Sequence, residues 1–474
     1  MIFWLLVHDL VKISIPVSTK SDEWIAAEVL RDEFIYMQSQ DAVQVTAEPE
    51  NKTEASIDLA AKFLAHIASN VDNDPQSTEA RIQVLFNVLQ YFTSLYLTTK
   101  DVHSLCASFL PDIRKSVLAA YFRAVAVLED KGVSSIPRQP ESALLNAAVS
   151  GKASIFALFG GQGTNEVYFD ELQSLFDIYQ PYVLPFLEVV VADLIELAKE
   201  EVESSYFTYG LDVVSWLSGA VERPSVSYLA SIPISLPLIG LTQLVQYLIV
   251  CRVTNLNPGQ IRDRITGATG HSQGIVSAVV VSASGTFDDL TSNSRKALRW
   301  LFYSGLRGQQ AFPPVAVEPS LVQDTLDGGE GTPSPMLSIA GLSFKDLDKQ
   351  IVKTNSHLPA SSRLAISLHN GPRAFVVTGP PRALHGLVTN LRKIRATSGA
   401  DQSKVPYSQR KPVFSVRFLM VEVPYHSDYL GGVTDIVADE DLQEELWVPS
   451  DLKIPVYHTE TGESLVTQCI SWSH

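Results

Sequence analysis

The sequence predicts an α/β fold, in which a core built on a mainly parallel sheet carries an inserted subdomain and follows a mostly helical N-terminal domain. Two observations lead to this prediction. From residue 148 onward, short apolar runs such as 154–159 alternate with long helical stretches, which is typical of a parallel sheet. Between residues 333 and 420 the order of strands and helices changes, which indicates a separate subdomain.

Composition indicates a folded chain of several domains. The 474 residues are 46% hydrophobic, with 36 basic against 52 acidic side chains and a net charge of -16. At roughly 100–200 residues per domain, this length predicts two or more domains. The acidic excess argues against a nucleic-acid partner. Cys106, Cys251 and Cys469 show no paired or metal-ligand spacing, so we expect no metal site, no disulfide framework and a cytoplasmic setting.

The first 145 residues are expected to form a helical domain with a structural role. Amphipathic helices are predicted at 21–38, 56–70 and 79–97. The run MIFWLLVHDLV at the start is short, has no basic region before it and contains Asp9, which fits a first strand better than a signal peptide. Turn-forming residues at 132–142 place the boundary near residue 145, so that the second domain covers 146–474.

The stretch from Tyr228 to Cys251 has no charged residue and is long enough to span a bilayer. It contains Pro233 and Pro237 as well as two glutamines, and arginines flank it. We therefore predict no membrane span. A buried strand and loop are expected instead, followed by a core helix that begins near Leu236, with the prolines close to its start.

Residues 333–420 follow the order strand, helix, strand, strand, helix, strand. The strands are expected at 336–340, 363–369, 374–378 and 413–419, and the helices at 344–354 and 381–395. This is the split βαβ order of a ferredoxin-like subdomain. A small subdomain inserted into a larger α/β domain leaves a cleft between the two, where ligands often bind.

The sharpest chemical signal is the pentapeptide Gly270-His271-Ser272-Gln273-Gly274. In a G-x-S-x-G turn the glycines allow a sharp passage from strand to helix, which exposes the serine hydroxyl beside a helix N-terminus. The run 265–269 before the motif and the apolar run 275–281 after it fit the strand and helix that such a turn requires. Ser272 is therefore the predicted nucleophile.

A second glycine-rich turn, Phe159-Gly160-Gly161-Gln162-Gly163, follows the strand predicted at 154–159. Such a turn can supply one backbone N–H of an oxyanion hole, here from Gln162, while the residue after the nucleophile, Gln273, supplies the other. A dinucleotide-binding G-x-G-x-x-G motif is the alternative. It is disfavoured because no third glycine follows Gly163 at the required spacing.

A serine needs a base to become nucleophilic at neutral pH, and the chain has ten histidines. We predict that His426 is this base, because it lies in the segment Val423-Pro-Tyr-His-Ser-Asp428, where the chain returns from the subdomain to the cleft. His271 neighbours Ser272, but its side chain is expected to point the other way along the turn. We therefore expect His271 to support the turn.

Together, FGGQG, GHSQG and PYHS resemble the acyltransferase domain of the β subunits of fungal type I fatty acid synthases. Longer segments are similar as well, at 231–244, 267–274, 366–381 and 398–419, and the resemblance continues as far as Thr461. It implies an acyltransferase fold with a hydrolase-like parallel-sheet core. It also implies that the helical N-terminal domain serves assembly.

The resemblance further implies acyl transfer in two steps. Ser272, activated by His426, would attack the thioester of an acyl-CoA, and the acyl-serine would pass its group to the phosphopantetheine thiol of an acyl carrier protein. No bound cofactor is implied. The expected partners are the synthase α subunit with its carrier protein and further β subunits. Asn370, in the turn His369-Asn370-Gly371, would be a substrate-binding residue of the cleft.

The resemblance also bears on the acyl group. Relatives that load malonyl groups carry an arginine on the helix after the nucleophile, which pairs with the free carboxylate. The corresponding position here is Ser304, which favours a neutral acyl group. Ser304 is smaller than the branched apolar residue expected for acetyl loading, so a longer chain such as hexanoyl is an alternative, as in specialised fungal synthases that make starter acids for polyketide toxins. Arg307 is interpreted as structural.

Family β subunits continue into reductase, dehydratase and further transferase domains, and we expect this chain to be a truncated gene product. The missing part would include a backbone carbonyl that orients the catalytic histidine, which predicts low activity. Two alternatives stay open. A serine hydrolase or thioesterase would use water as the acceptor and would need an acid partner for the histidine. A catalytically silent scaffold piece would dock through its helical domain.

Overall fold

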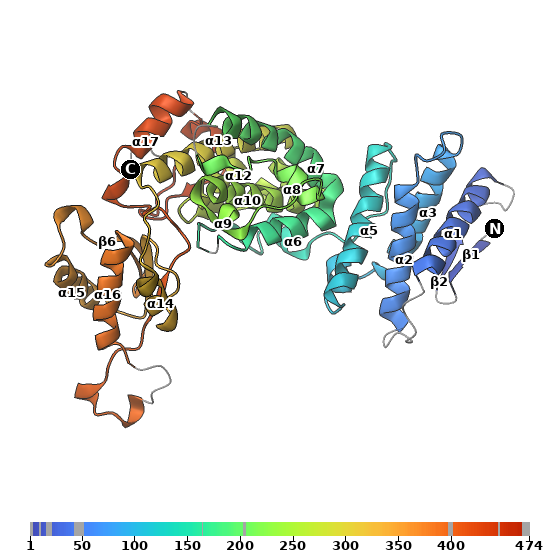
Figure 1. Ribbon diagram of the computed structural model, residues 1–474. Helices are drawn as coiled ribbons and strands as arrows, with labels where there is room; N and C mark the ends of the chain where they lie inside the picture. Colours follow the sequence, from blue (N-terminus) through green and yellow to red (C-terminus); the bar gives the residue numbers. More distant parts are fainter. Residues whose placement is uncertain are drawn as a thin grey trace. The chain divides into compact units, whose positions relative to one another are not determined.

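The computed structural model describes residues 3–8, 11–15, 21–41, 52–163, 165–201, 205–396, 402–443 and 446–466 (Figure 1). The chain divides into two compact units, one made of Met1–Ser154, Leu172–Glu188 and Val245–Asn257, the other of Ile155–Glu171, Val189–Leu244 and Pro258–His474. Two long helices, α7 (Tyr168–Glu200) and α10 (Ile232–Thr254), contribute to both units. The domain boundary near residue 145 stays a prediction.

The first unit is helical apart from one hairpin. The strands β1 (Phe3–His8) and β2 (Val11–Ile15) pair antiparallel, so the N-terminal strand is observed as predicted. The helices are α1 (Asp22–Asp41), α2 (Lys52–Ser69), α3 (Thr78–Tyr96), α4 (Val102–Cys106), α5 (Pro111–Asp130) and α6 (Ala143–Val149). Phe63, Phe92 and Tyr121 are among the largest side chains of its core. Cys106 and Cys251 are buried free thiols, and Cys469 lies outside the described residues.

The second unit is built on a three-stranded parallel sheet, as the sequence predicts. Its strands are β3 (Phe156–Phe159), β4 (Gly267–Gly270) and β9 (Val456–Tyr457), in the order β3-β4-β9. Phe159 pairs in register with Gly270. Because parallel strands end at the same edge of a sheet, the glycine-rich turn after β3 and the serine turn after β4 leave that edge side by side.

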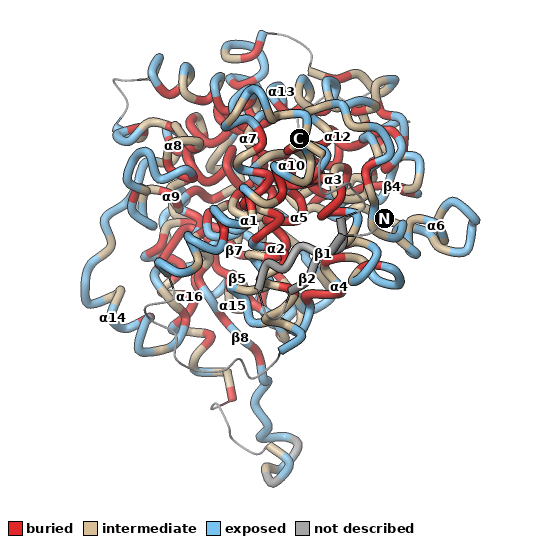
Figure 2. Tube along the Cα trace, turned by 90° about the vertical axis from the view of Figure 1, so that its right-hand side faces the viewer, coloured by how far each residue is buried: buried red, intermediate tan, exposed pale blue. Residues whose placement is uncertain are grey.

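The helices of this unit are α8 (Val213–Ser218), α9 (Val226–Ala230), α11 (Pro258–Arg262), α12 (Gly274–Ala283), α13 (Phe287–Ala311), α14 (Pro319–Asp327) and α17 (Val433–Ile436). A π-helical segment, η7 (Val437–Leu442), continues α17. Helix α12 follows β4 directly and packs against β3, β4 and β9. Figure 2 shows that buried residues follow α10 and α12, which form much of the core of this unit.

The prediction for Tyr228–Cys251 is wrong in one respect. No strand precedes the core helix, because the chain forms α9 and then enters α10 at Ile232. Pro233 lies in the first turn of α10. The N–H groups of this turn have no acceptor within the helix, so a proline there removes no helical hydrogen bond. In the described part of the chain, α10 is long and apolar enough to cross a bilayer, and 83% of its most apolar window is buried. A core helix of a globular domain has the same properties.

The inserted subdomain has the predicted order of elements. They are β5 (Met336–Ala340), α15 (Phe344–Asn355), β6 (Ala365–Gly371), β7 (Ala374–Thr378), α16 (Pro381–Ile394) and β8 (Ser415–Phe418). The strands form an antiparallel sheet in the order β6-β7-β5-β8, as expected for a ferredoxin-like fold. Helices α15 and α16 cover one face of the sheet, with Leu347, Leu384 and Val377 in their shared core.

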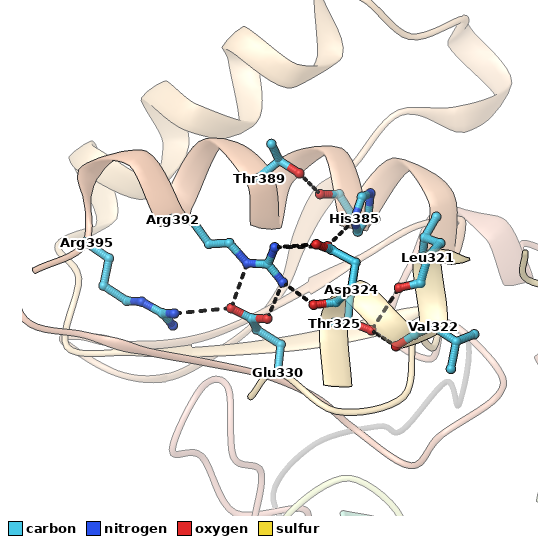
Figure 3. A network of polar contacts seen from close by, with 9 residues as sticks. All are labelled: Leu321, Val322, Asp324, Thr325, Glu330, His385, Thr389, Arg392 and Arg395. Atoms are coloured by element: carbon cyan, nitrogen blue, oxygen red, sulfur yellow. Dashed lines mark hydrogen bonds and ion pairs between the residues drawn. The ribbon is translucent and has the colours of Figure 1, made fainter. Parts of the chain in front are cut away.

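A polar cluster fixes the entry into this subdomain (Figure 3). Glu330 has no exposed surface, and its carboxylate pairs with Arg392 at 2.6 Å and with Arg395 at 3.2 Å. Arg392 also pairs with Asp324 on α14, which in turn contacts His385 Nε2 at 2.8 Å. A carboxylate is buried without a large cost only where cations pair it. The cluster therefore ties α14 to α16.

Candidate active site

Ser272 lies in the sharp turn between β4 and α12. Its φ is 52°, in the left-handed region that L residues rarely adopt, and strained backbone of this kind is found at functional sites. The turn is stabilised by the N–H of Gly274, which donates to the carbonyl of His271 at 3.0 Å. The serine hydroxyl is thereby placed at the carboxyl edge of the parallel sheet, beside the N-terminus of α12.

The two glycines that flank Ser272 are sterically required. A Cβ atom on Gly270 would overlap with the backbone of Gly274, and a Cβ atom on Gly274 would overlap with the carbonyl groups of Phe159 and Gly160. The turn after β4 and the turn after β3 are therefore in backbone contact. A side chain at Gly274 would push these two turns apart, and one at Gly270 would distort the serine turn itself.

His426 contacts the predicted nucleophile, since its Nε2 lies 2.8 Å from Ser272 Oγ. The φ of His426 is 60°, so both partners of this contact have left-handed backbone. Although part of His426 faces solvent, the surrounding protein removes water from the imidazole and lowers its pKa below 6.5, and the nearby His271 lowers that pKa further. A neutral imidazole at pH 7 can accept the serine proton.

The second ring nitrogen of His426, Nδ1, has no hydrogen-bond partner among the residues that the structure describes. In serine enzymes a group that accepts from this nitrogen holds the tautomer in which the other nitrogen is the base. The described residues therefore supply a nucleophile and a base, and no third member of a triad.

Two backbone N–H groups are available to an oxyanion. Within the described ranges, neither the N–H of Gln162 nor that of Gln273 donates a hydrogen bond to another residue. Both belong to turns at the same edge of the parallel sheet, and the ring nitrogen Nδ1 and carbonyl of His271 come within 3 Å of where a Cβ atom of Gly161 would lie. Both donors therefore belong to turns that adjoin Ser272, and an oxyanion hole made by these two N–H groups stays a prediction.

Side chains from α10 hold the turn after β3 in place. The amides of Gln162 and Asn165 both donate to Ser235 Oγ, at 3.2 and 3.3 Å. Gln243 donates to the carbonyl of Gly160 at 2.7 Å and accepts from Ser277 of α12 at 2.7 Å. The turn is therefore fixed before any ligand binds, which is the property that oxyanion donors need.

Asn370 lies at the end of β6 and links the subdomain to the serine turn. Its Oδ1 is 3.0 Å from His271 Nε2. His271 therefore holds Asn370. The structure does not bring Asn370 into contact with Ser272, so a role in substrate binding stays a prediction.

Ser304 is buried in α13, with 9% of its surface exposed. Its carbonyl accepts a hydrogen bond from the hydroxyl of Tyr425 at 3.3 Å. The same hydroxyl would lie 3.0 Å from a Cβ atom on Gly308, so it packs against this glycine. Tyr425 is the residue before His426, and burial raises the pKa of its phenol well above 10. Tyr425 thus anchors the histidine-bearing loop on the helix that carries Ser304.

Arg307 forms a two-pronged ion pair with Asp441, with Nε–Oδ2 and Nη2–Oδ1 distances of 2.9 and 2.5 Å. Side-chain hydrogen bonding to Asp441 raises the pKa of Arg307 above its usual range. Gln310 accepts from its third nitrogen at 2.8 Å. The ion pair with Asp441 therefore holds η7 against α13.

The side chain of Gln273 is buried, with 6% of the residue exposed, and neither its amide oxygen nor its amide nitrogen has a partner among the described residues. A buried amide without partners costs about 1–3 kcal/mol. We expect Gln273→Leu to raise the free energy of unfolding of the second unit by about 1 kcal/mol or more, measured by thermal or urea denaturation. A lower stability of the variant would show that the amide has a partner, such as a buried water.

Comparison with known proteins identifies the family. The model of "Starter unit:ACP transacylase in aflatoxin biosynthesis" matches residues 157–412, a range that contains Ser272 and the inserted subdomain. This chain belongs to that transacylase family. A second model, "N-terminal domain in fatty acid synthase subunit beta", matches residues 4–128. The two matches together correspond to the N-terminal part of a fungal fatty acid synthase β subunit, which supports an acyltransferase role.

Relatives of this chain are curated fungal proteins. The fatty acid synthase subunit beta of Schizosaccharomyces pombe is 38% identical over 94% of this chain, and the fatty acid synthase beta subunit TOXC of Cochliobolus carbonum is 36% identical over 88%. The chain spans 21% and 20% of their lengths. Among solved structures, a type II polyketide synthase malonyl-transacylase with its acyl-carrier protein aligns with 66% of this chain and 76% of its own, at TM-score 0.40 and 16% identity.

Several residues of this site carry no recognisable signal in the sequence. Asn165 and Ser235 act through hydrogen bonds to each other and to the turn after β3, and Asp441 acts through Arg307. The role of Tyr425 could be predicted in part, because a tyrosine next to a predicted catalytic histidine is a candidate for positioning that histidine. The others depend on contacts between segments far apart in the chain.

Proposed function

We propose that this chain transfers an acyl group from an acyl-CoA to an acyl carrier protein through an acyl-Ser272 intermediate. The observation that carries the proposal is the 2.8 Å contact between Ser272 Oγ and His426 Nε2, in a turn that adjoins two backbone N–H groups without a hydrogen-bond partner among the described residues. A serine, a neutral imidazole and two oxyanion donors are the parts that acyl transfer needs. The family match supports the same chemistry.

The proposed reaction has two half-reactions. In the first, His426 takes the proton of Ser272, whose oxygen attacks the thioester carbon, and the N–H groups of Gln162 and Gln273 hold the resulting oxyanion. The carbon–sulfur bond then breaks, and His426 returns the proton to the leaving CoA thiolate. In the second, His426 takes the proton of the phosphopantetheine thiol, which attacks the acyl-serine and releases Ser272 with its proton restored.

The contacts around α13 favour a neutral acyl group. Arg307 is the arginine of this helix nearest to Ser304, and its guanidinium is committed to Asp441 and Gln310. Its charge is therefore already paired with a carboxylate, which disfavours a second pairing with the carboxylate of a malonyl group. We propose a neutral starter such as acetyl or hexanoyl.

The partners and setting are part of the same proposal. The acyl acceptor is the phosphopantetheine arm of a carrier protein in a fatty acid synthase assembly, with an α subunit and further β subunits as neighbours, in the cytoplasm. Family membership and relatives named as fatty acid synthase β subunits support it.

Product analysis tests this function. The chain is incubated with acetyl-, hexanoyl- or malonyl-CoA and a phosphopantetheinylated carrier protein, and free CoA, free acid and acyl-carrier are measured. We expect acyl-carrier from the two neutral donors and little from malonyl-CoA. Free acid as the main product would favour a thioesterase, and no CoA release above background would favour the silent scaffold.

A further inference from the structure

The inserted subdomain has a charge opposite to that of the rest of the chain. Residues 333–420 contain 13 lysines and arginines against three aspartates and no glutamate, a net charge of +10 within a chain of net charge -16. The residues outside the subdomain therefore carry a net charge of -26. An acidic partner would be repelled by most of this chain and attracted to the subdomain.

Helix α15 carries three of these lysines in one row, together with Asp346 and Asp348. Lys345, Lys349 and Lys353 follow one another at intervals of four residues, so they lie along the same side of the helix, and all three are exposed. Across the described ranges, none of them forms an ion pair or a side-chain hydrogen bond. The carboxylates of Asp346 and Asp348 make no ion pair with them either. Like charges at this spacing repel one another, and no direct ion pair among the described residues offsets the repulsion within the row.

Exposed apolar side chains accompany the lysines. Phe344 at the start of α15 is 49% exposed, and Val352 near its end is 60% exposed. A phosphate site needs donors and no apolar surface, whereas a protein interface combines apolar contacts with a charged rim. The composition of this face therefore favours a protein partner over the phosphates of a nucleotide.

Contacts connect the start of α15 to the serine turn. The ring of Phe344 lies 5.5 Å from the ring of His369, between their centroids. The next residue, Asn370, contacts His271, which precedes Ser272. A protein bound along α15 would thus sit on the side of the subdomain that leads to the nucleophile.

We propose that this α15 face, formed by Lys345, Lys349, Lys353, Phe344 and Val352, is the docking surface for the acyl carrier protein, and that the face of the carrier that binds here is acidic. The inference rests on the proposed function, because the carrier is its acceptor. Electrostatic attraction at this surface would increase the rate of encounter with a carrier that the remainder of the chain repels.

The test reverses the three lysine charges with K345E/K349E/K353E. We expect the KM for a phosphopantetheinylated acyl carrier protein to rise at least about tenfold, and direct calorimetric binding of that carrier to weaken by a similar factor. Acylation of Ser272 by acyl-CoA and transfer to free pantetheine should change by less than about twofold, because neither uses a protein surface. Higher salt should raise the carrier KM of the unmodified chain more than that of the variant.

A matched variant, K100E/K152E/K199E, makes the same change in net charge outside the subdomain, at three exposed lysines. We expect it to leave carrier binding nearly unchanged.

Unchanged carrier binding in the α15 variant, with a normal melting temperature, would overturn the proposal. A rise in the KM for acyl-CoA alone would also overturn it, since the row would then bind the phosphates of CoA. Failure of the unmodified chain to acylate Ser272 would count against the proposed function, whereas calorimetry would still test the docking surface.

Discussion

Replacing His426 by alanine is expected to slow the acylation of Ser272 by about 10²–10⁴-fold, the range in which a positioned general base contributes. The reason is the 2.8 Å contact between His426 Nε2 and Ser272 Oγ, without which the serine keeps its proton at neutral pH. Stopped-flow or quenched-flow measurement of CoA release gives the rate. A useful control is His385→Ala, because His385 contacts Asp324 on α14 and has no contact with Ser272.

The same histidine predicts the pH dependence. Burial lowers the pKa of His426 below 6.5, and only the neutral imidazole can take the serine proton. The acylation rate should therefore be flat near pH 7 and fall as the pH drops through that lowered pKa, at a pH below 6.5. A rate that falls already between pH 8 and 7 would contradict this assignment of the base.

The substitution Gly274→Ala is expected to destabilise the second unit by about 3 kcal/mol, because the new Cβ would overlap with two backbone carbonyl groups that cannot move independently of β3. The turn after β3 and the serine turn would have to separate, so the oxyanion donors and Ser272 would also lose their arrangement. Thermal denaturation measures the loss of stability, and the acylation rate should fall with it.

Gly160→Ala is the matched comparison. Gly160 lies in the neighbouring turn, and a Cβ atom there would have no atom within 4 Å. We expect its melting temperature to stay close to that of the unmodified chain. Equal melting temperatures for the two variants would show that the serine turn can relax to admit a side chain.

The sequence predicts much of the fold because its signals are local. The alternation of strands and helices between residues 333 and 420 predicts the inserted subdomain, since period and length distinguish strands from helices there. The start of α10 could not be predicted in the same way. Pro233 and Pro237 are typical of a loop, and only the packing of α10 into the core shows that this segment is helical.

The residues of the site differ in the same way, since some are predicted by local motifs and others depend on tertiary contacts. Ser272 and Gln273 are found by a contiguous motif, whose glycines are explained by contacts with the turn after β3. His426 follows from the position of its loop, and the structure brings it to Ser272. The support from Ser235 and the Arg307–Asp441 pair could not be predicted, because each depends on segments that only the tertiary structure brings together.

The central claim is that Ser272 becomes acylated, and intact-protein mass spectrometry tests it most directly. The chain and its Ser272→Ala variant are each incubated with acetyl-, hexanoyl- and malonyl-CoA, and the masses of the proteins are compared. The proposed chemistry predicts an acetyl or hexanoyl adduct on the unmodified chain, little malonyl adduct, and no adduct on the variant. An adduct that persists in Ser272→Ala, or a folded chain that forms none with any donor, would contradict it.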